Sequence, residues 1–364
     1  MIPRLVWENI RHRPIRTLLS MLLIAVPVTL ILTLIGLING YTEESRKRQS
    51  GVGADIRMTA PGASALSFSA TTIPEKLVPV VASEPHVRQA IGTVIFPIAG
   101  WDFAVGIDPA EFDRMSGGFV FDAGHTLQAP NDVLVDTWYA DQRHVGLGGK
   151  VNFAGHDWRV AGIVEPGKLG HLFVLKKVIQ DYAGLGDKVS QIYIKLDSPA
   201  NLDSTVDYLK KKYDGYGVLS MAELASLISV DNVPYLKPFL RVIIGIGVII
   251  AFFVVSLSMY MAVLQRTREI GILKSLGASN RLVMILILSE AFFMGLGGTI
   301  LGILLSYLTQ YAIHAVMPAS LPQAIVYSWW PKAGAIAMGA ALLGALYPAM
   351  IAVKQDPIEA LAYE

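Results

Sequence analysis

The chain has 364 residues, of which 53% are hydrophobic and only 16% are charged, and its formal net charge is +1. Soluble domains carry about 25% charged residues, so this composition places part of the chain in lipid, and the near-neutral balance argues against a nucleic-acid partner. The chain contains no cysteine, which excludes disulfides, thiolate metal ligands and cysteine nucleophiles.

Four apolar runs reach the length of about 20 residues that a membrane-spanning helix needs. They cover residues 17–40, 239–264, 282–311 and 333–353. The first run could be a cleavable signal peptide, but its apolar core exceeds the usual length of about 7–15 residues and no clear small-residue cleavage site follows it. We therefore interpret it as a retained anchor. Pro27 and Pro348 lie inside the first and fourth runs and are expected to kink their helices.

Basic residues beside these runs predict the orientation, because short cytoplasmic segments are rich in lysine and arginine. Arginines precede the first span, and four basic residues lie between the second and third, whereas residues 312–331 contain neither lysine nor arginine. The basic residues at 46–48 run against this pattern. We expect both termini and the segment between spans two and three in the cytoplasm, with residues 41–238 outside.

The segment 41–238 is long enough for a folded domain, and its pattern predicts an α+β fold. Short apolar runs between turn residues predict strands at 132–136, 150–155, 158–164 and 191–196. A helix is predicted over residues 199–213 with Ser198 as its cap. Residues 52–72 are rich in glycine, alanine and serine, so we expect a loose connection or mobile loop there. Polar helical stalks are expected at 41–50 and 221–232.

Patterns of catalytic and metal-binding residues are missing from the sequence. The run GLGGK at 146–150 has the wrong spacing for a phosphate-binding loop and predicts a tight turn before a strand. None of the seven histidines forms a close ligand pair, so a surface or structural role is expected for each. No G-x-S-x-G nucleophile motif is present. We expect no catalytic residue, no metal site and no cofactor in this chain.

Glycines at a spacing of four residues predict close contacts between membrane helices. The expected packing positions are the pair Gly36 and Gly40 in the first span and the pair Gly298 and Gly302 in the third, where Gly295 extends the same stripe. The alternative is that glycine is simply common in membrane helices. One acid, Glu290, lies well inside an apolar run, where a carboxylate is costly. We favour a structural or inter-helix role for Glu290 over a proton relay.

A segment of mixed character, QRTREIGILKSLGAS at 265–279, lies between the second and third spans. Its apolar residues follow one helical stripe, and charged residues cover the other sides. Gly277 can end such a helix in a left-handed cap, and Ser279 can cap the next helix. The pattern predicts a short amphipathic helix on the cytoplasmic face. This helix either lies among lipid headgroups or docks on a protein.

With these motifs, the chain resembles the permeases of the MacB/FtsX-type ABC transporters. The resemblance rests on RTREIGILKSLGAS, on the following LSEAFFMGLGGTILG and on the C-terminal DPIEALAYE. In that last motif, Ala362 and Tyr363 stand where the family often has a basic residue. The stretches WENIRHRPIRTLLSMLLIAV and GLGGKVNFAGHDWRVAGIV are similar to the first span and the outer domain of the family.

This resemblance implies an α-helical membrane protein with four transmembrane helices and an α+β extracytoplasmic domain inserted between spans 1 and 2. Residues 1–40 would form the cytoplasmic N-terminus and the first span, and residues 41–238 the stalks and a MacB-like domain. Residues 239–364 would form an FtsX-like permease domain. The implied location is the bacterial cytoplasmic membrane, in a dimer with a second permease, either a copy of itself or a related paralogue.

The family also implies a partner ATPase that binds ATP and Mg, and a cytoplasmic coupling helix that contacts it. Because Met1 lies close to the first span, we expect the ATPase to be a separate chain. Ile270, Ile272 and Leu273 would be buried in the ATPase cleft, and Arg266, Arg268 and Glu269 would lie at its rim. The full set of expected coupling residues is Arg266, Arg268, Glu269, Ile270, Gly271, Ile272, Leu273, Lys274, Leu276, Gly277 and Ser279.

The implied activity is mechanotransmission, in which ATP hydrolysis moves the spans and the stalks carry that motion to the outer domain. The substrate would be a lipid, lipoprotein, peptide or drug, often handled with a periplasmic adaptor protein. One alternative is a signalling permease that activates a cell-wall hydrolase. A second is a membrane receptor that senses a ligand through its outer domain. A membrane enzyme is a further alternative that no catalytic residues support.

Overall fold

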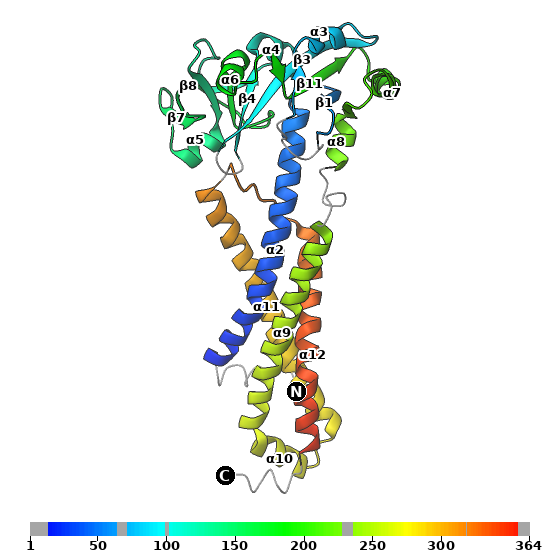
Figure 1. The fold of residues 1–364 in the computed structure, drawn as a ribbon. Coiled ribbons are helices and arrows are strands. Elements are labelled where there is room, and N and C mark those ends of the chain that lie inside the picture. Colours follow the sequence, from blue (N-terminus) through cyan, green and yellow to red (C-terminus); the bar gives the residue numbers. More distant parts are fainter. Residues whose placement is uncertain (1–13, 64–70, 99–101, 228–235, 318, 356–364) are drawn as a thin grey trace. The chain divides into compact units, whose positions relative to one another are not determined.

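A computed structural model describes residues 14–63, 71–98, 102–227, 236–317 and 319–355, and the chain divides into two compact units. The first, called the helical bundle below, comprises Met1–Asn39, Tyr235–Ala312 and Gln323–Glu364. The second, called the sheet domain, comprises Gly40–Pro234 and Ile313–Pro322. Figure 1 labels helices of both units and some strands of the sheet domain. The short segment Ile313–Pro322 was not expected to join the domain.

Four helices among the described residues are long and apolar enough to cross a membrane, which confirms the predicted spans. They are α2 (Pro14–Ser50), α9 (Leu236–Gln265), α11 (Asn280–Val316) and α12 (Trp330–Lys354). Two short elements accompany them, α10 (Thr267–Ser275) after α9 and η2 (Tyr327–Trp329) before α12. α2 continues past Pro27 and α12 past Pro348. The last turns of α2, from Gly40, belong to the sheet domain and form the predicted helical stalk.

Helices of the bundle approach one another at glycines. A Cβ added to Gly298 would lie 2.7 Å from Cβ of Ile24 on α2, and one added to Gly302 would lie 2.7 Å from Cβ of Val28. Gly295, on the same helix α11, faces α12, where a Cβ would lie 3.3 Å from Cβ of Ala341. The three glycines of α11 therefore pack spans of one chain against each other. At Gly298 and Gly302 only a missing side chain permits these distances, whereas at Gly295 an added Cβ would make a tight contact.

Gly36 has a different neighbour from the one its spacing suggests. An added Cβ would lie 2.8 Å from the backbone oxygen of Ala324, and the Ala324 amide donates to the Gly36 carbonyl at 2.9 Å. The expectation of helix–helix packing at Gly36 is therefore wrong, because the extended chain before α12 covers this face. Gly40, one turn further on, is buried within the sheet domain.

A ten-stranded, mostly antiparallel sheet forms the centre of the sheet domain. Its strand order is β12-β1-β11-β3-β4-β9-β6-β8-β5, with β7 paired to β8. The pairs β4–β9 and β6–β8 are parallel. The strands are β1 (Ile56–Thr59), β3 (Val87–Pro97), β4 (Phe103–Ile107), β5 (Phe121–Gly124), β6 (Asp132–Asp136), β7 (Lys150–Phe153), β8 (His156–Val164), β9 (Leu172–Leu175), β11 (Gln191–Leu196) and β12 (Gly217–Ser220). Two further strands, β2 (Ile73–Pro74) and β10 (Lys188–Val189), pair separately.

Helices flank this sheet, and the predicted helix at 199–213 is confirmed among them. They are α3 (Leu77–Ala82), α4 (Pro109–Ser116), α5 (Thr137–Arg143), α6 (Lys176–Tyr182), α7 (Leu202–Lys212) and α8 (Met221–Leu227). The predicted helix at 199–213 is the 3-10 turn η1 (Pro199–Asn201) followed by α7, and the Ser198 side chain accepts a hydrogen bond from the Ala200 amide. α8 covers the first part of the predicted stalk at 221–232, and residues 228–232 lie outside the described residues.

The expectation of a loose connection over residues 52–72 is wrong for its first half. β1 lies inside the sheet between β11 and β12, and Ile56 and Met58 are fully buried. The small residues around β1 concealed a short alternation of large apolar side chains, which is the signal of a strand. Residues 64–70 of the expected loop lie outside the described residues.

Candidate functional site

The segment between the second and third spans forms the predicted short helix, α10. Gly277 has φ +91°, and the Ala278 amide donates to the Leu273 carbonyl at 3.0 Å, so the helix ends in the predicted left-handed cap. The Ser279 hydroxyl then accepts a 3.3 Å hydrogen bond from the Leu282 amide at the start of α11. A reversal confined to a few residues is possible because glycine adopts positive φ without steric cost.

The two faces of α10 differ in exposure. Ile270, only 7% exposed, and Gly271 are buried against the bundle, whereas Leu276 is 79% exposed and Ile272 43%. The expectation that Ile270 enters an ATPase cleft is therefore wrong. Ile270 and Leu276 are six residues apart, about 1.7 helical turns, so they cannot share one face. Leu273 lies between these extremes at 38% exposure.

Arg266, which precedes α10, faces inward rather than lying at a rim. Its Nη1 lies 3.2 Å from Oε2 of Glu290 on α11, and both side chains are largely buried. This corrects the expected outward position of Arg266. The ion pair also accounts for the acid in the third span, since a buried carboxylate is tolerated only when it is paired. Arg268 and Glu269, by contrast, are exposed.

Lys274 ties α10 to the last turn of α12. Its ammonium donates to the carbonyl of Val353 at 2.8 Å and to that of Gln355 at 2.6 Å. Gln355 returns a 3.4 Å hydrogen bond to the Thr267 hydroxyl. The last carbonyl groups of a helix have no hydrogen-bond donor within the helix. A lysine at this position supplies that donor, and its positive charge is attracted to the negative end of the helix dipole. The Lys274 side chain is therefore directed toward the helical bundle.

A cavity of about 130 Å³ lies between α9, α10 and α11. Its walls are mostly apolar and include Met259, Val263, Ile270, Val283 and Ile287. Arg266 and Glu290 also line this cavity. Ile270 and Leu273 of α10 therefore face this space on the flank that is turned toward the bundle.

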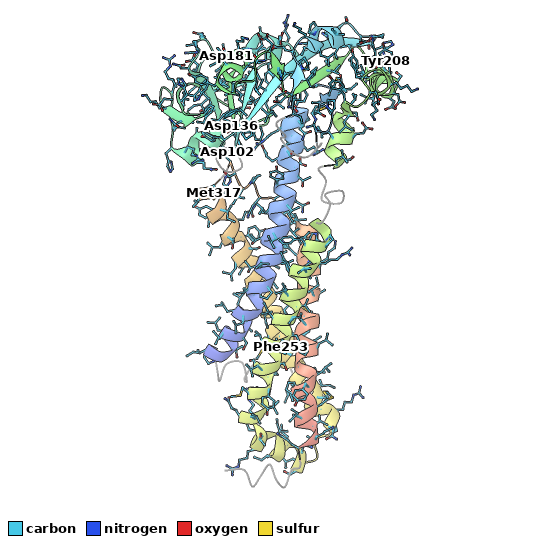
Figure 2. All side chains as sticks on the ribbon, viewed as in Figure 1. Asp102, Asp136, Asp181, Tyr208, Phe253 and Met317 are labelled. Atoms are coloured by element: carbon cyan, nitrogen blue, oxygen red, sulfur yellow. The ribbon has the colours of Figure 1, made fainter. Side chains whose placement is uncertain are left out.

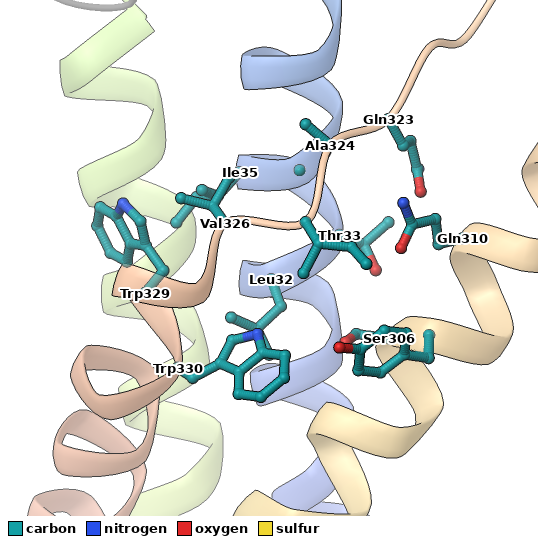
Figure 3. A pocket seen from close by; sticks show the side chains of 13 residues that line it. Leu32, Thr33, Ile35, Ser306, Gln310, Gln323, Ala324, Val326, Trp329 and Trp330 are labelled. Atoms are coloured by element: carbon teal, nitrogen blue, oxygen red, sulfur yellow. The ribbon is translucent and has the colours of Figure 1, made fainter.

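Polar side chains also meet at a much smaller cavity in the bundle, of about 20 Å³ (Figure 3). Thr33 of α2, Gln310 of α11 and Gln323 line it, with Trp329 and Trp330 beside them. In Figure 3, the amides of Gln310 and Gln323 point toward one another. The lining contains no charged side chain, so this cavity suits an uncharged group of about the size of a water molecule.

A buried polar cluster in the sheet domain was not predicted from the sequence. His171, 5% exposed, contacts Oδ2 of Asp136 through Nδ1 at 2.5 Å. Its Nε2 lies 3.0 Å from the Ala319 carbonyl oxygen and also contacts Nη2 of Arg48 on α2. Arg48 in turn donates to Glu44 at 3.0 Å. Asp136 is labelled in Figure 2.

Ala319 and the residue after it, Ser320, are also bound by Gln142 of α5. The Gln142 side-chain oxygen accepts from the amides of Ala319 at 3.0 Å and Ser320 at 3.1 Å, and its nitrogen donates to the Ser320 hydroxyl at 2.7 Å. Asp136 caps α5 by accepting from the Tyr139 amide at 2.8 Å. The histidine partners therefore come from three distant parts of the sequence, and no local motif could have revealed them.

A second buried acid, Glu84, is surrounded by donors. It accepts from Lys212 at 2.8 Å, Tyr208 at 2.9 Å and Tyr213 at 2.6 Å. Burial works to raise the pKa of Glu84, but these three donors outweigh burial and hold that pKa below its usual value. Burial and the contact with Glu84 raise the pKa of the Tyr213 hydroxyl to about 12. Among the described residues, no group of three or more histidine, aspartate or glutamate side chains could hold a metal ion.

Comparison with known families matches the two parts of the chain to two models. Residues 17–212, more than half of the chain, match the MacB-like periplasmic core domain, and residues 241–357 match the FtsX-like permease C-terminal domain. The chain belongs to the MacB/FtsX family of ABC transporter permeases. It is accordingly a multi-pass membrane protein, and permeases of this class act with an ATPase partner.

Relatives of known sequence agree with this placement. The uncharacterized ABC transporter permease YvrN of Bacillus subtilis is 23% identical over 412 residues, covering 99% of each chain. The B. subtilis permease YknZ is 34% identical over 42% of this chain and 37% of its own length. The macrolide export ATP-binding/permease protein MacB of Bdellovibrio bacteriovorus is 28% identical over 46% of this chain and 27% of its own.

Solved structures give weaker likenesses. The extracellular domain of YknZ aligns with 46% of this chain at 14% identity and a TM-score of 0.37. The periplasmic region of MacB from Actinobacillus actinomycetemcomitans aligns with 49% at 15% identity and a TM-score of 0.37.

Proposed function

We propose that this permease transmits the work of a partner ATPase to its sheet domain, and that α10 is the element that the ATPase contacts. The observation that carries this proposal is the two-sided character of α10. One side presents Ile272 and Leu276 together with the charged Arg268 and Glu269. Exposed apolar residues with charges beside them suit a protein contact, with apolar burial supplying affinity and the charges fixing register.

The other side of α10 is attached to two spans. Arg266 joins it to α11 through Glu290, and Lys274 joins it to the end of α12. A displacement of α10 by the ATPase would therefore reach two membrane helices through charged hydrogen bonds, which are stronger than neutral ones. In this account ATP and Mg bind in the ATPase, and this chain supplies no catalytic group.

The substrate class that we propose is an amphiphile, meaning a lipid, lipoprotein, peptide or drug, moved on the outer side of a bacterial cytoplasmic membrane. Two relatives support transport: MacB, named for macrolide export, and the Staphylococcus haemolyticus protein HrtB, named as a putative hemin transport permease and 25% identical over 59% of this chain. Both termini would be cytoplasmic. The working unit would contain a second permease and, for export, a periplasmic adaptor.

The test replaces Leu276, the exposed leucine directly after α10, by aspartate. The full chain would be purified in mild detergent from its native host, and ATP hydrolysis by the co-purified ATPase would be measured. We expect Leu276→Asp to lose the ATPase activity and Leu147→Asp, a 55% exposed leucine of the sheet domain, to keep it. Equal activity in the two variants would refute the assignment of α10.

Two further variants separate contact from coupling. Gly277→Val places a β-branched residue at φ +91°, and Glu269→Lys reverses a charge beside the contact surface. We expect both to uncouple ATP hydrolysis from transport. Normal coupled transport in both variants would contradict the proposed role.

A further inference from the structure

The Nε2 atom of His171 meets two partners with opposite requirements. The Ala319 carbonyl can only accept a hydrogen bond, whereas the Arg48 guanidinium can only donate one. Nδ1 faces the Asp136 carboxylate at 2.5 Å, so it carries a hydrogen and donates to that oxygen. Nε2 is therefore the position at which the ring gains or loses a proton.

Each protonation state satisfies one partner and opposes the other. In the neutral ring Nε2 accepts from Arg48 and has no hydrogen to donate to the Ala319 oxygen. In the imidazolium Nε2–H donates to the Ala319 oxygen, and the ring and Arg48 become two like charges in contact. Both hydrogen bonds cannot be made by the same atom in the same state.

We propose that protonation of His171 switches the sheet domain between two anchors. The neutral ring holds Arg48, at the end of α2, and the charged ring holds the segment Ile313–Pro322, which begins with the last residues of α11 and continues toward α12. Gln142 keeps this segment near the domain in both states, so the switch changes how firmly the segment is fixed. The proposal goes beyond the coupling role of α10 and does not depend on it.

The surroundings of His171 contain charges of both signs. Glu44 and Arg48 come from α2, Asp136 from the end of β6, and Arg57 from β1. Asp102, which pairs with Arg143 at 3.4 Å, lines the same cavity of about 80 Å³ as His171 (Asp102 is labelled in Figure 2). The described residues of the segment, 313–317 and 319–322, include one titratable side chain, the exposed His314, and no lysine, arginine, aspartate or glutamate. Arg48 is therefore the cation that opposes the charged ring directly, and Asp136 the anion that stabilises it.

Hydrogen exchange of the full chain in lipid nanodiscs tests the switch. Protection of the peptide covering residues 313–322 would be measured at about pH 5 and about pH 8, the range over which histidine changes charge, and corrected for intrinsic exchange rates. We expect protection to fall by about tenfold at the higher pH, as befits loss of a hydrogen bond from a charged donor. A peptide covering β6 would keep its protection and report that the domain stays folded.

Two variants assign the effect. His171→Gln cannot titrate and should show equal protection of the segment at both pH values. His86→Gln is the matched control, because His86 also contacts an aspartate, Asp197 at 3.3 Å, but is half exposed. It should respond like the unaltered chain. Equal protection at both pH values in the unaltered chain, or a pH response that survives His171→Gln, would overturn the proposal.

Discussion

The interior of the helical bundle and the interior of the sheet domain are filled by side chains of different size. In the bundle, α12 buries alanines and glycines, among them Ala341, Gly344 and Ala345. In the sheet domain the largest fully buried side chains include Trp158, Tyr193 and Phe173. The bundle should therefore be damaged most by added volume, and the sheet domain by removed volume.

A physical reason lies in the surroundings of each part. Apolar side chains gain nothing by leaving lipid for a helix interface, so membrane helices depend on close van der Waals contact, which small residues allow. A domain in water gains free energy in proportion to the apolar area that it buries, which favours large side chains. The predictions below test this difference, from the largest expected effect to the smallest.

Truncating the sheet-domain core should cost the most. Trp158 stacks on Phe153 at a ring distance of 4.9 Å and donates its indole N–H to the Phe153 carbonyl at 3.2 Å. We expect Trp158→Ala to lower the free energy of unfolding of the domain by about 3–5 kcal/mol, measured by denaturant titration of the full chain in detergent. Leu147→Ala, at a half-exposed site, should change it by less than about 0.5 kcal/mol. Equal effects would mean that Trp158 is not part of a close-packed core.

Adding volume to the bundle should cost nearly as much. A Cβ at Gly298 would contact Ile24 at 2.7 Å and the Met21 backbone oxygen at 3.0 Å, so Gly298→Leu should separate α11 from α2. We expect a loss of about 3 kcal/mol, the upper part of the usual range for overpacking, measured by thermal unfolding in detergent. Gly339→Leu is the control, because nothing lies within 4 Å of an added Cβ there. Similar melting temperatures for the two variants would contradict the packing account.

Removing the charge of Glu84 should have an intermediate effect. Glu84→Gln keeps the shape of the side chain but weakens the hydrogen bonds from Lys212, Tyr208 and Tyr213. We expect a loss of about 1.5–3 kcal/mol, the value of a hydrogen bond to a charged group, in denaturant titration near neutral pH. An unchanged free energy of unfolding would show that burial costs the carboxylate as much as its donors return.

The same residue predicts a pH dependence. The pKa of Glu84 is lowered in the folded chain, so its contribution to stability is complete above the unfolded value of about 4.3 and is lost as the pH falls through the folded value. The unaltered chain should therefore lose more stability than Glu84→Gln on acidification below about pH 4. Parallel curves for the two chains would contradict the predicted direction of the pKa shift.

Removing a threonine hydroxyl from α2 should have the smallest effect on stability, and α2 offers two threonines for comparison. Thr29 donates to the Ala25 carbonyl at 2.9 Å and lies 3.1 Å from the Gly302 carbonyl, whereas the buried hydroxyl of Thr33 has no hydrogen-bond partner among the described residues. We expect Thr29→Val to cost about 1 kcal/mol and Thr33→Val to be neutral or slightly stabilising, in thermal unfolding. The reverse order would indicate that the Thr33 hydroxyl is engaged.

Sequence alone predicted the parts of this molecule whose signals are local. The spans follow from length and hydropathy, β6 and β11 from short apolar runs, and the end of α10 from Gly277. β1 was missed because four residues among many small ones give a weak strand signal.

Positions that depend on distant partners could not be predicted in the same way. The inward directions of Ile270 and Arg266 are set by α9 and α11, and the role of Lys274 is set by the end of α12. The cluster around His171 joins positions 48, 136, 171 and 319, which no spacing rule connects. A charged or small residue in a membrane helix therefore indicates that the residue has a contact partner, but the sequence does not identify which residue that partner is.

The proposed path from α10 into the bundle can be tested most directly by removing its two attachments. The complex with the ATPase would be purified with Arg266→Met, Lys274→Met or both, and ATP hydrolysis would be measured together with the ATP-driven change in hydrogen exchange of the sheet domain. The account predicts that the double variant keeps ATP hydrolysis but loses the change in the sheet domain. A sheet domain that still responds fully to ATP in the double variant would contradict it.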